Sequence, residues 1–278
     1  MRAENKHYWN MKQHYYGDAG TFDIQTNPEW LAVRRGKFTA SEAADMLSSS
    51  RSKDEVLGKT AKAVCRRVLT DRFTSFERPA DKDAWALKDS VARGLQLEPR
   101  ARELYEHQTG FEVKECGFVE HCSGWFGFSP DGIVEDENMG IEIKCPEPDN
   151  AQRLIDEVGD PDHLKQIAFA MWVDGLDCYD YVIYSPELCQ GLELDDQVFI
   201  FSFSRDELQE YIDEIDKRAP ILLEYINKSV VNLKKIGKKT SIYPQKELNN
   251  GRFRKLVLSG VILFLSYVCY NMVVRHYY

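Results

Sequence analysis

Residues 129–145 of the chain read SPDGIVEDENMGIEIKC, in which short apolar runs alternate with Gly, Asp and Asn. Two β-branched runs on either side of a polar turn, near Asp136 to Asn138, predict a β-hairpin. Side chains alternate between the two faces of a strand, so Glu142 and Lys144 share one face. Across the hairpin, Asp131 is expected to lie opposite Glu142. The sequence therefore predicts that two carboxylates and one ammonium converge.

These groups have the chemistry of a hydrolytic metal site. Asp131, Glu142 and the main-chain carbonyl of Ile143 offer the oxygen ligands that Mg²⁺ prefers, with Mn²⁺ as a substitute. Lys144 would stand beside the attacking water, where it can orient that water, assist its deprotonation or stabilise the phosphate in the transition state. The pattern favours phosphodiester hydrolysis. The alternative is that Glu142 and Lys144 form the solvent face of an ordinary edge strand.

The rest of the chain predicts an α/β fold, with a mixed central β-sheet flanked by helices in one main domain. Apolar periodicity and turn residues place the helices at 56–69, 84–97, 99–109, 161–172 and 205–228. Pro99 is expected to begin a new helix rather than to continue the preceding one. Shorter β-branched or aromatic runs predict strands at 111–120, 125–128, 132–136, 141–145, 179–185 and 197–204.

Charge is distributed unevenly along the chain, whose net charge is -9. Residues 229–278 hold nine Lys and Arg against one Glu, which leaves a net charge of -17 on residues 1–228. Binding to phosphate needs local positive potential, so any contact with nucleic acid must be concentrated. The candidate contacts are Arg34, Arg35 and Lys37, and a second run that includes Lys59, Lys62, Arg66, Arg67 and Arg72. An ordinary solvated helix face would also explain the second run.

Five motifs occur in an order that is typical of one family. They are Trp30-x3-Arg34 with Thr39-Ala-Ser41, Gly94-x3-Glu98-Pro99, Ser129-Pro130-Asp131-Gly132, Glu142-Ile143-Lys144, and a helix bearing Gln166 before Met171-Trp172. This arrangement resembles the lambda exonuclease or YqaJ-type viral recombinase family of the PD-(D/E)XK nuclease superfamily. The resemblance covers about residues 27–186.

The resemblance implies a nuclease that digests one strand of linear duplex DNA from the 5′ end in viral or phage recombination. It also implies Mg²⁺ dependence, a homotrimer and a single-strand-annealing partner protein. Carried over by position, Asp131 and Glu142 would bind the metal, Glu98 would assist them, Lys144 would act on the water, and Gln166 would support Lys144 or the phosphate. The alternatives are a structure-specific or restriction-type endonuclease on the same fold, and a non-catalytic DNA-binding recombination scaffold.

A pocket for the 5′-terminal phosphate is expected around Arg34, Ser41 and Ser129, because guanidinium and hydroxyl groups at a helix start suit an anion. Arg35 competes for this role, and a salt bridge from Arg34 to Glu29 or Glu42 is the alternative. His163 stands where lambda exonuclease has a tyrosine, and we treat it as a further candidate site residue that is equally compatible with an ordinary polar position.

The chain is expected to comprise a nuclease domain (1–228), a basic linker (229–255) and a hydrophobic tail (256–278). Seven irregularly spaced cysteines and an N-terminus without a secretion signal favour a cytoplasmic protein. The 19 uncharged residues from 256 to 274 are long enough to span a bilayer, so they predict a C-terminal membrane tether. A buried helix, or a tail acquired by gene fusion or frame change, would explain them equally well.

Overall fold

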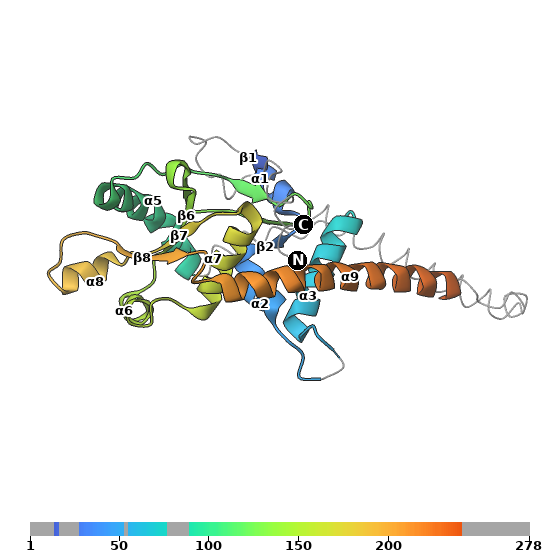
Figure 1. Cartoon of the computed structure of the whole chain (residues 1–278). Helices are drawn as coiled ribbons and strands as arrows, with labels where there is room; N and C mark the ends of the chain where they lie inside the picture. The colour runs from blue at the N-terminus through green and yellow to red at the C-terminus, as the bar shows by residue number, and fades with distance from the viewer. Residues whose placement is uncertain (1–13, 17–27, 53–54, 77–88, 241–278) are drawn as a thin grey trace, which may run out of the picture. The chain divides into compact units, whose positions relative to one another are not determined.

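A computed structural model describes residues 14–16, 28–52, 55–76 and 89–240 (Figure 1). The chain divides into two compact units, Met1–Ile226 and Asn227–Tyr278. No helix within the described residues is long and apolar enough to cross a membrane. The predicted hydrophobic tail at 256–278 lies outside the described residues, so the tether stays a prediction.

Within the described residues, the strands form two four-stranded sheets, each with the mixed pairing that the sequence predicts. The first sheet has the order β1-β3-β4-β2 and consists of β1 (His14–Tyr16), β3 (Phe118–Glu120), β4 (Phe126–Phe128) and β2 (Phe38–Thr39). The second sheet has the order β5-β6-β7-β8 and consists of β5 (Gly132–Val134), β6 (Met139–Lys144), β7 (Cys178–Ile183) and β8 (Phe199–Ser204). The α/β class is confirmed. The sequence predicted one central sheet, whereas the described strands form two.

The helices of the first unit surround these sheets. They are α1 (Pro28–Arg34), α2 (Ala43–Leu47), α3 (Lys59–Phe73), α5 (Asp89–Thr109), α6 (Pro148–Asp156), α7 (Pro161–Asp174) and α8 (Pro186–Gly191). Helices α6, α7 and α8 each begin at a proline, whose fixed φ suits the first helical position and whose missing N–H has no partner there anyway. Helix α9 (Gln209–Thr240) begins in the first unit and ends in the second.

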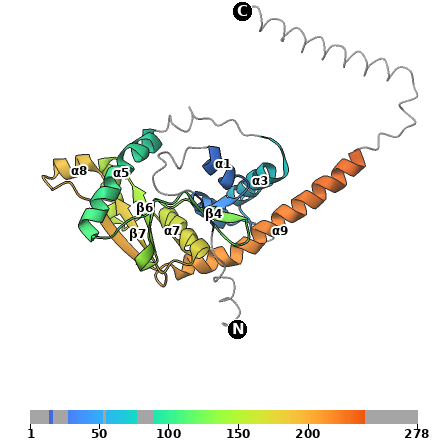
Figure 2. The same cartoon turned by 90° about the horizontal axis from the view of Figure 1, so that it is seen from above.

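Two helices cover opposite faces of the second sheet. From α5, the side chains of Ala101, Leu104 and Tyr105 pack in one buried cluster with Ile141 and Ile143 of β6. Helix α7 contacts β7 of the second sheet and also β4 of the first, and Figure 2 shows it between the two. The site residues carried by α5 and α7 are therefore held on a common core.

The predicted and observed elements differ in several places, including strands β1 and β2, which were not predicted. Helix α5 runs without interruption through Pro99, because Leu97 before it and Ala101 after it pack against the same core. The strand expected at 111–120 is reduced to β3, since Lys114 pairs by a single bridge with Ile133. The last helix begins at Gln209 rather than at residue 205 and continues to Thr240. Helices α6 and α8 were not predicted.

Candidate active site

The predicted hairpin brings Asp131 and Glu142 together at one end of the second sheet. Strands β5 and β6 pair in antiparallel orientation, with Gly132 opposite Ile141, so the start of β5 lies beside the end of β6. The Asp131 Oδ2 accepts a hydrogen bond from the backbone N–H of Ile143 at 2.7 Å. Asp131 is thus tied to β6 beside Glu142. The Ile143 N–H faces Asp131, while the role of its carbonyl as a ligand stays a prediction.

Glu142 is the centre of a hydrogen-bonded group of three side chains. Its Oε1 accepts from the Lys144 Nζ at 2.5 Å and from the Gln166 Nε2 of α7 at 2.7 Å. Strand β6 lies between β5 and β7, and the Glu142 side chain is only 5% exposed. Glu142 therefore does not lie on the solvent face of an edge strand, which excludes that alternative.

The fourth predicted residue, Glu98, approaches from α5 but faces an arginine. Its Oε1 forms an ion pair with Arg102 at 2.8 Å, and the Glu98 side chain is 20% exposed. Burial raises the pKa of Glu98, Arg102 opposes this increase, and Glu142 adds to it. Glu98 therefore lies close enough to Glu142 for their charges to interact.

Burial and neighbouring charges shift the pKa values of two site residues, Asp131 and Lys144. Burial raises the pKa of Asp131 well above its usual range, and the negative charges of Glu142 and Glu98 raise it further. For Lys144, burial favours the neutral amine, but the neighbouring Glu142 and Asp131 outweigh it and raise the pKa of the ammonium. The two carboxylates thus favour the protonated form of Lys144, in which it is a charged hydrogen-bond donor.

The same electrostatics suit a divalent cation. No three His, Cys, Asp or Glu side chains within the described residues form a complete metal-binding group by themselves. Asp131 and Glu142 nevertheless provide two carboxylates in a buried place where negative charge is unfavourable, as the raised pKa of Asp131 shows. A hard cation would relieve that repulsion, and Mg²⁺ characteristically combines one or two carboxylates with water and substrate phosphate. The donor set fits the predicted metal.

His163 lies beside this group and is fixed by a tyrosine. Its Nδ1 is 2.7 Å from the Tyr181 hydroxyl, and Tyr181 is the residue opposite Glu142 in the pairing of β6 with β7. Burial lowers the pKa of His163, and the nearby Lys144 lowers it further. A neutral imidazole at this position can donate a hydrogen bond to the Tyr181 hydroxyl or accept one from it, and it adds no charge to the site.

A second cluster forms where the phosphate pocket was predicted, and it joins Arg34 to Ser129. The Ser129 Oγ accepts hydrogen bonds from the Trp30 Nε1 at 2.8 Å and from the Arg34 Nη1 at 3.1 Å. The Arg34 guanidinium also stacks on the Trp30 ring, 4.3 Å from its centroid. Ser129 precedes Asp131 by two residues. This cluster therefore adjoins the carboxylate site along the chain.

Arg34 has the electrostatic character of an anion-binding group. Burial lowers the pKa of its guanidinium to about 10, and Glu42 acts in the opposite direction. Arg34 forms no ion pair with a described carboxylate. Glu42, the predicted partner, is instead paired with Arg67 at 2.6 Å. The expected alternative, a salt bridge from Arg34 to Glu42, is therefore not formed.

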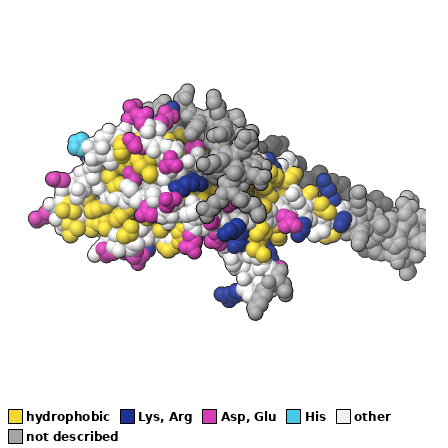
Figure 3. All heavy atoms as spheres, viewed as in Figure 1, with side chains coloured by type: hydrophobic (Ala, Val, Ile, Leu, Met, Phe, Trp, Pro, Cys, Tyr) yellow, Lys and Arg dark blue, Asp and Glu magenta, His cyan; other side chains and the backbone are white. Residues whose placement is uncertain are grey.

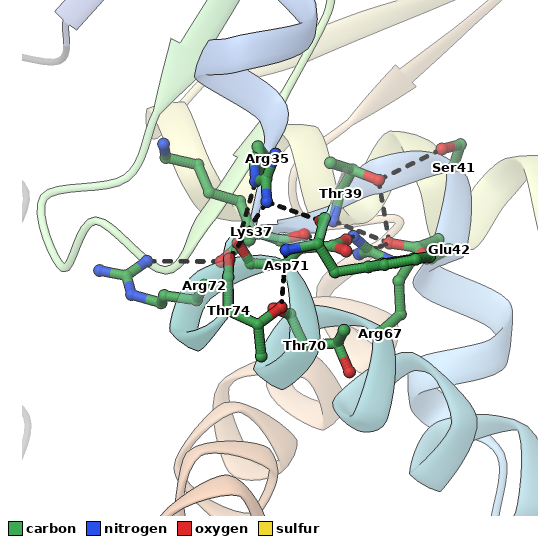
Figure 4. A network of polar contacts seen from close by, with 12 residues as sticks. Arg35, Lys37, Thr39, Ser41, Glu42, Arg67, Thr70, Asp71, Arg72 and Thr74 are labelled. Atoms are coloured by element: carbon green, nitrogen blue, oxygen red, sulfur yellow. Dashed lines mark hydrogen bonds and ion pairs between the residues drawn. The ribbon is translucent and has the colours of Figure 1, made fainter. Parts of the chain in front are cut away.

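The other two residues predicted for the phosphate pocket lie in a neighbouring network (Figure 4). Arg35 donates to the backbone carbonyls of Asp71, Thr74 and Phe76 at the end of α3, at 3.0, 3.2 and 2.8 Å. These bonds give Arg35 a structural role. Ser41 is exposed, and its Oγ lies 3.4 Å from the hydroxyl of Thr39. None of the described hydrogen bonds joins Ser41 to Arg34 or Ser129.

Charged side chains of both signs are mixed on the face that Figure 3 shows. Acidic side chains are spread over the part that carries α5, α6 and α8, and Lys and Arg form small separate groups. Within α3, Lys62 is paired with Glu55 and Arg67 with Glu42, while Lys59 and Arg66 are exposed. Only part of the predicted basic run is therefore available to a phosphate backbone.

Sequence reasoning missed two residues of the site. Arg102 contacts Glu98 and the backbone of Asp131, and Tyr181 contacts His163. The spacing of Glu98 and Arg102, four residues apart on one helix, was a usable signal for an ion pair. Nothing in the sequence pairs Tyr181 with His163, because the contact depends on how α7 packs on β7.

Replacement of Gln166 tests how much its hydrogen bond to Glu142 contributes to the site. In Gln166→Leu, Glu142 loses one of its two donors, and a hydrogen bond to a charged group contributes roughly 1.5–3 kcal/mol. We expect the turnover of linear duplex DNA to fall about tenfold, with the melting temperature nearly unchanged. Gln209→Leu is the control, because the Gln209 amide bonds to Asp213 at the surface of α9. Unchanged turnover in Gln166→Leu would remove this residue from the site.

The chain matches the model of a known protein family. Residues 29–177 match the family model of the YqaJ-like viral recombinase domain, which is more than half of the chain. The chain therefore belongs to the family of YqaJ-like viral recombinase domains. No curated protein matches the sequence.

Among solved structures, the chain is similar to an alkaline exonuclease, LHK-Exo from Laribacter hongkongensis. The two share 29% sequence identity with a TM-score of 0.62, over 77% of this chain and 100% of that chain. The complex of LHK-Exo with dAMP gives a TM-score of 0.63 at the same identity and coverage. A phage related exonuclease from Haemophilus somnus 129PT is 18% identical, with a TM-score of 0.51 over 71% of this chain and 96% of that chain, and shows the same fold.

Proposed function

We propose that this protein is a Mg²⁺-dependent DNA exonuclease that hydrolyses one strand of linear duplex DNA from the 5′ end. The observation that carries the proposal is the convergence of Asp131, Glu142, Lys144 and Gln166 from a hairpin and a helix. The similarity to LHK-Exo, an alkaline exonuclease whose complex with dAMP is known, supports exonuclease activity. The order of these residues is that of the PD-(D/E)XK superfamily.

Each residue has a defined task in this proposal. Asp131 and Glu142 would hold the metal, with Mn²⁺ as a substitute for Mg²⁺. The chemistry that the metal supplies when bound is neutralisation of the phosphate charge and activation of water. The Lys144 ammonium donates a hydrogen bond, which can orient the attacking water or stabilise the negative charge that develops on the phosphate oxygens. Gln166 donates to Glu142 and so helps to fix the carboxylate that Lys144 also contacts.

The direction of digestion is assigned to the Trp30, Arg34 and Ser129 cluster. Because the Ser129 Oγ accepts from both Trp30 and Arg34, its own hydroxyl proton is directed to a further acceptor. That proton and the Arg34 guanidinium together form a donor pair for the oxygens of a terminal phosphate. The end of a 5′-phosphorylated strand is the ligand that such a pair would select.

The biological setting that follows from the family is viral or phage recombination. The exposed 3′ strand left by such an enzyme is the substrate of a single-strand-annealing protein, which we propose as its partner. A homotrimer that encircles the duplex would add processivity to the same chemistry. Both proposals are open to direct measurement, by co-purification and by light scattering.

Substrate shape separates an exonuclease from an endonuclease on the same fold. We expect the protein to degrade a linear 5′-phosphorylated duplex in Mg²⁺ and to leave a covalently closed circle of the same sequence intact. Addition of EDTA should stop the reaction, and readdition of Mg²⁺ or Mn²⁺ should restore it. The products are followed on gels and by release of labelled nucleotide.

Nicking of the closed circle would establish the endonuclease instead. Absence of hydrolysis on every DNA substrate in both metals would leave a non-catalytic scaffold as the surviving explanation.

A further inference from the structure

Arg102 of α5 contacts three separate parts of the first unit through one guanidinium. Its Nη2 forms an ion pair with Glu98 at 2.8 Å, and its Nη1 forms a second with Glu115 at 3.2 Å. Its Nε donates to the backbone carbonyl of Asp131 at 3.1 Å. The Arg102 side chain is only 13% exposed. The guanidinium therefore links two of the predicted acidic site residues directly.

The contact with Asp131 matters because strand β5 begins at the next residue, Gly132, so Asp131 lies just outside the paired strands. The last pair of the hairpin is Gly132 with Ile141, so no pair of the ladder fixes the backbone of Asp131. Two described hydrogen bonds hold Asp131. The Ile143 N–H donates to its carboxylate at 2.7 Å, and Arg102 donates to its backbone carbonyl. Removal of Arg102 leaves the first bond but removes the described hydrogen bond to the Asp131 carbonyl.

The shape of the side chain decides which replacement tests this role. A guanidinium is planar and presents its donors in a fixed fork, so it can serve three acceptors that lie in different directions. An ammonium keeps the positive charge but has no such fork. Arg102→Lys thus separates alignment from charge.

We propose that Arg102 is a positioning residue that fixes Asp131 relative to Glu98 and thereby sets the affinity of the site for a divalent cation. The inference rests on the proposed function, since it concerns the same carboxylates. A merely structural ion pair would contribute to stability but would leave cation binding unchanged. A residue in the shell around metal ligands typically changes metal affinity by roughly 10- to 100-fold when it is replaced.

The experiment compares Arg102→Lys with Arg100→Lys. Arg100 lies on the same helix and forms ion pairs with Glu103 and Asp196, but its side chain is 50% exposed. Binding of Mn²⁺ to the full-length, DNA-free protein is measured by calorimetry, and the Mg²⁺ concentration for half-maximal hydrolysis is measured on linear duplex. We expect Arg102→Lys to weaken both by about tenfold, while Arg100→Lys behaves as the unmodified protein.

Two results would overturn the proposal. Unchanged Mn²⁺ affinity in folded Arg102→Lys means that charge or stability, and not alignment, is the role of this residue. Equal weakening in Arg100→Lys means that the effect is not specific to the site. The calorimetric arm does not depend on hydrolysis, so a protein that binds Mn²⁺ through Arg102-aligned groups but cleaves no DNA would refute the proposed function alone.

Discussion

Lys144→Ala is expected to reduce the rate of hydrolysis of linear duplex DNA by about 10³-fold, which corresponds to roughly 4 kcal/mol. The ammonium donates directly to Glu142, and the charges of Glu142 and Asp131 raise its pKa, which favours the protonated form. Its loss removes stabilisation of the charge that develops on the phosphate in the transition state. The measurement is single-turnover release of labelled nucleotide at saturating Mg²⁺.

Lys114→Ala is the matched control for this prediction. Lys114 forms an ion pair with Glu135 on the surface, with both side chains more than half exposed, and such pairs contribute little. The melting temperature of Lys144→Ala should remain close to that of the unmodified protein, because the Lys144 side chain is 26% exposed and fills no apolar core. Full activity of folded Lys144→Ala would mean that the chemistry is performed elsewhere.

Arg34→Ala should slow the digestion of 5′-phosphorylated duplexes by roughly 10- to 100-fold, and that of 5′-hydroxyl duplexes far less. The estimate follows from the loss of a charge-assisted bond to a terminal phosphate, which contributes about 1.5–3 kcal/mol. Arg34 is suited to this bond because it is partly buried, stacks on Trp30 and forms no ion pair with a described carboxylate. Initial rates on the two kinds of end, in parallel reactions, measure the ratio.

Arg35→Ala controls for the loss of a neighbouring positive charge, because Arg35 bonds to carbonyls at the end of α3. Its effect should be on stability and should be the same for both kinds of end. If Arg34→Ala slows both ends equally, Arg34 is a general backbone contact and the direction of digestion has another cause.

The central part of the site was predictable from sequence because it depends on local periodicity. Alternation along β6 fixed the face shared by Glu142 and Lys144, and the hairpin turn fixed which residue lies opposite. These two features need only a few neighbouring residues to specify them. Gln166, in contrast, was expected at the site from the resemblance, and in the structure its amide donates to Glu142.

The remainder depends on contacts between distant residues. Trp30 and Ser129 are 99 positions apart, and no local pattern indicates that they hydrogen-bond. The continuity of α5 through Pro99 is decided by packing of Leu97 and Ala101 on the core, which outweighs the local preference of proline to begin a helix. The division of the strands into two sheets is also a tertiary choice, since a strand's own sequence does not name its partner.

Ser129 and Asp131 are separated by a single buried proline, Pro130. A span of two residues cannot exceed about 7 Å, and the ring of proline limits how far it can bend. In the proposed function, Ser129 holds the end of a strand and Asp131 serves the bond that is cut. The short covalent link would then keep the bound end of the strand at a nearly constant distance from the bond that is cut. Under the proposed function, the products should therefore have the same length at every step, whatever the sequence of the strand.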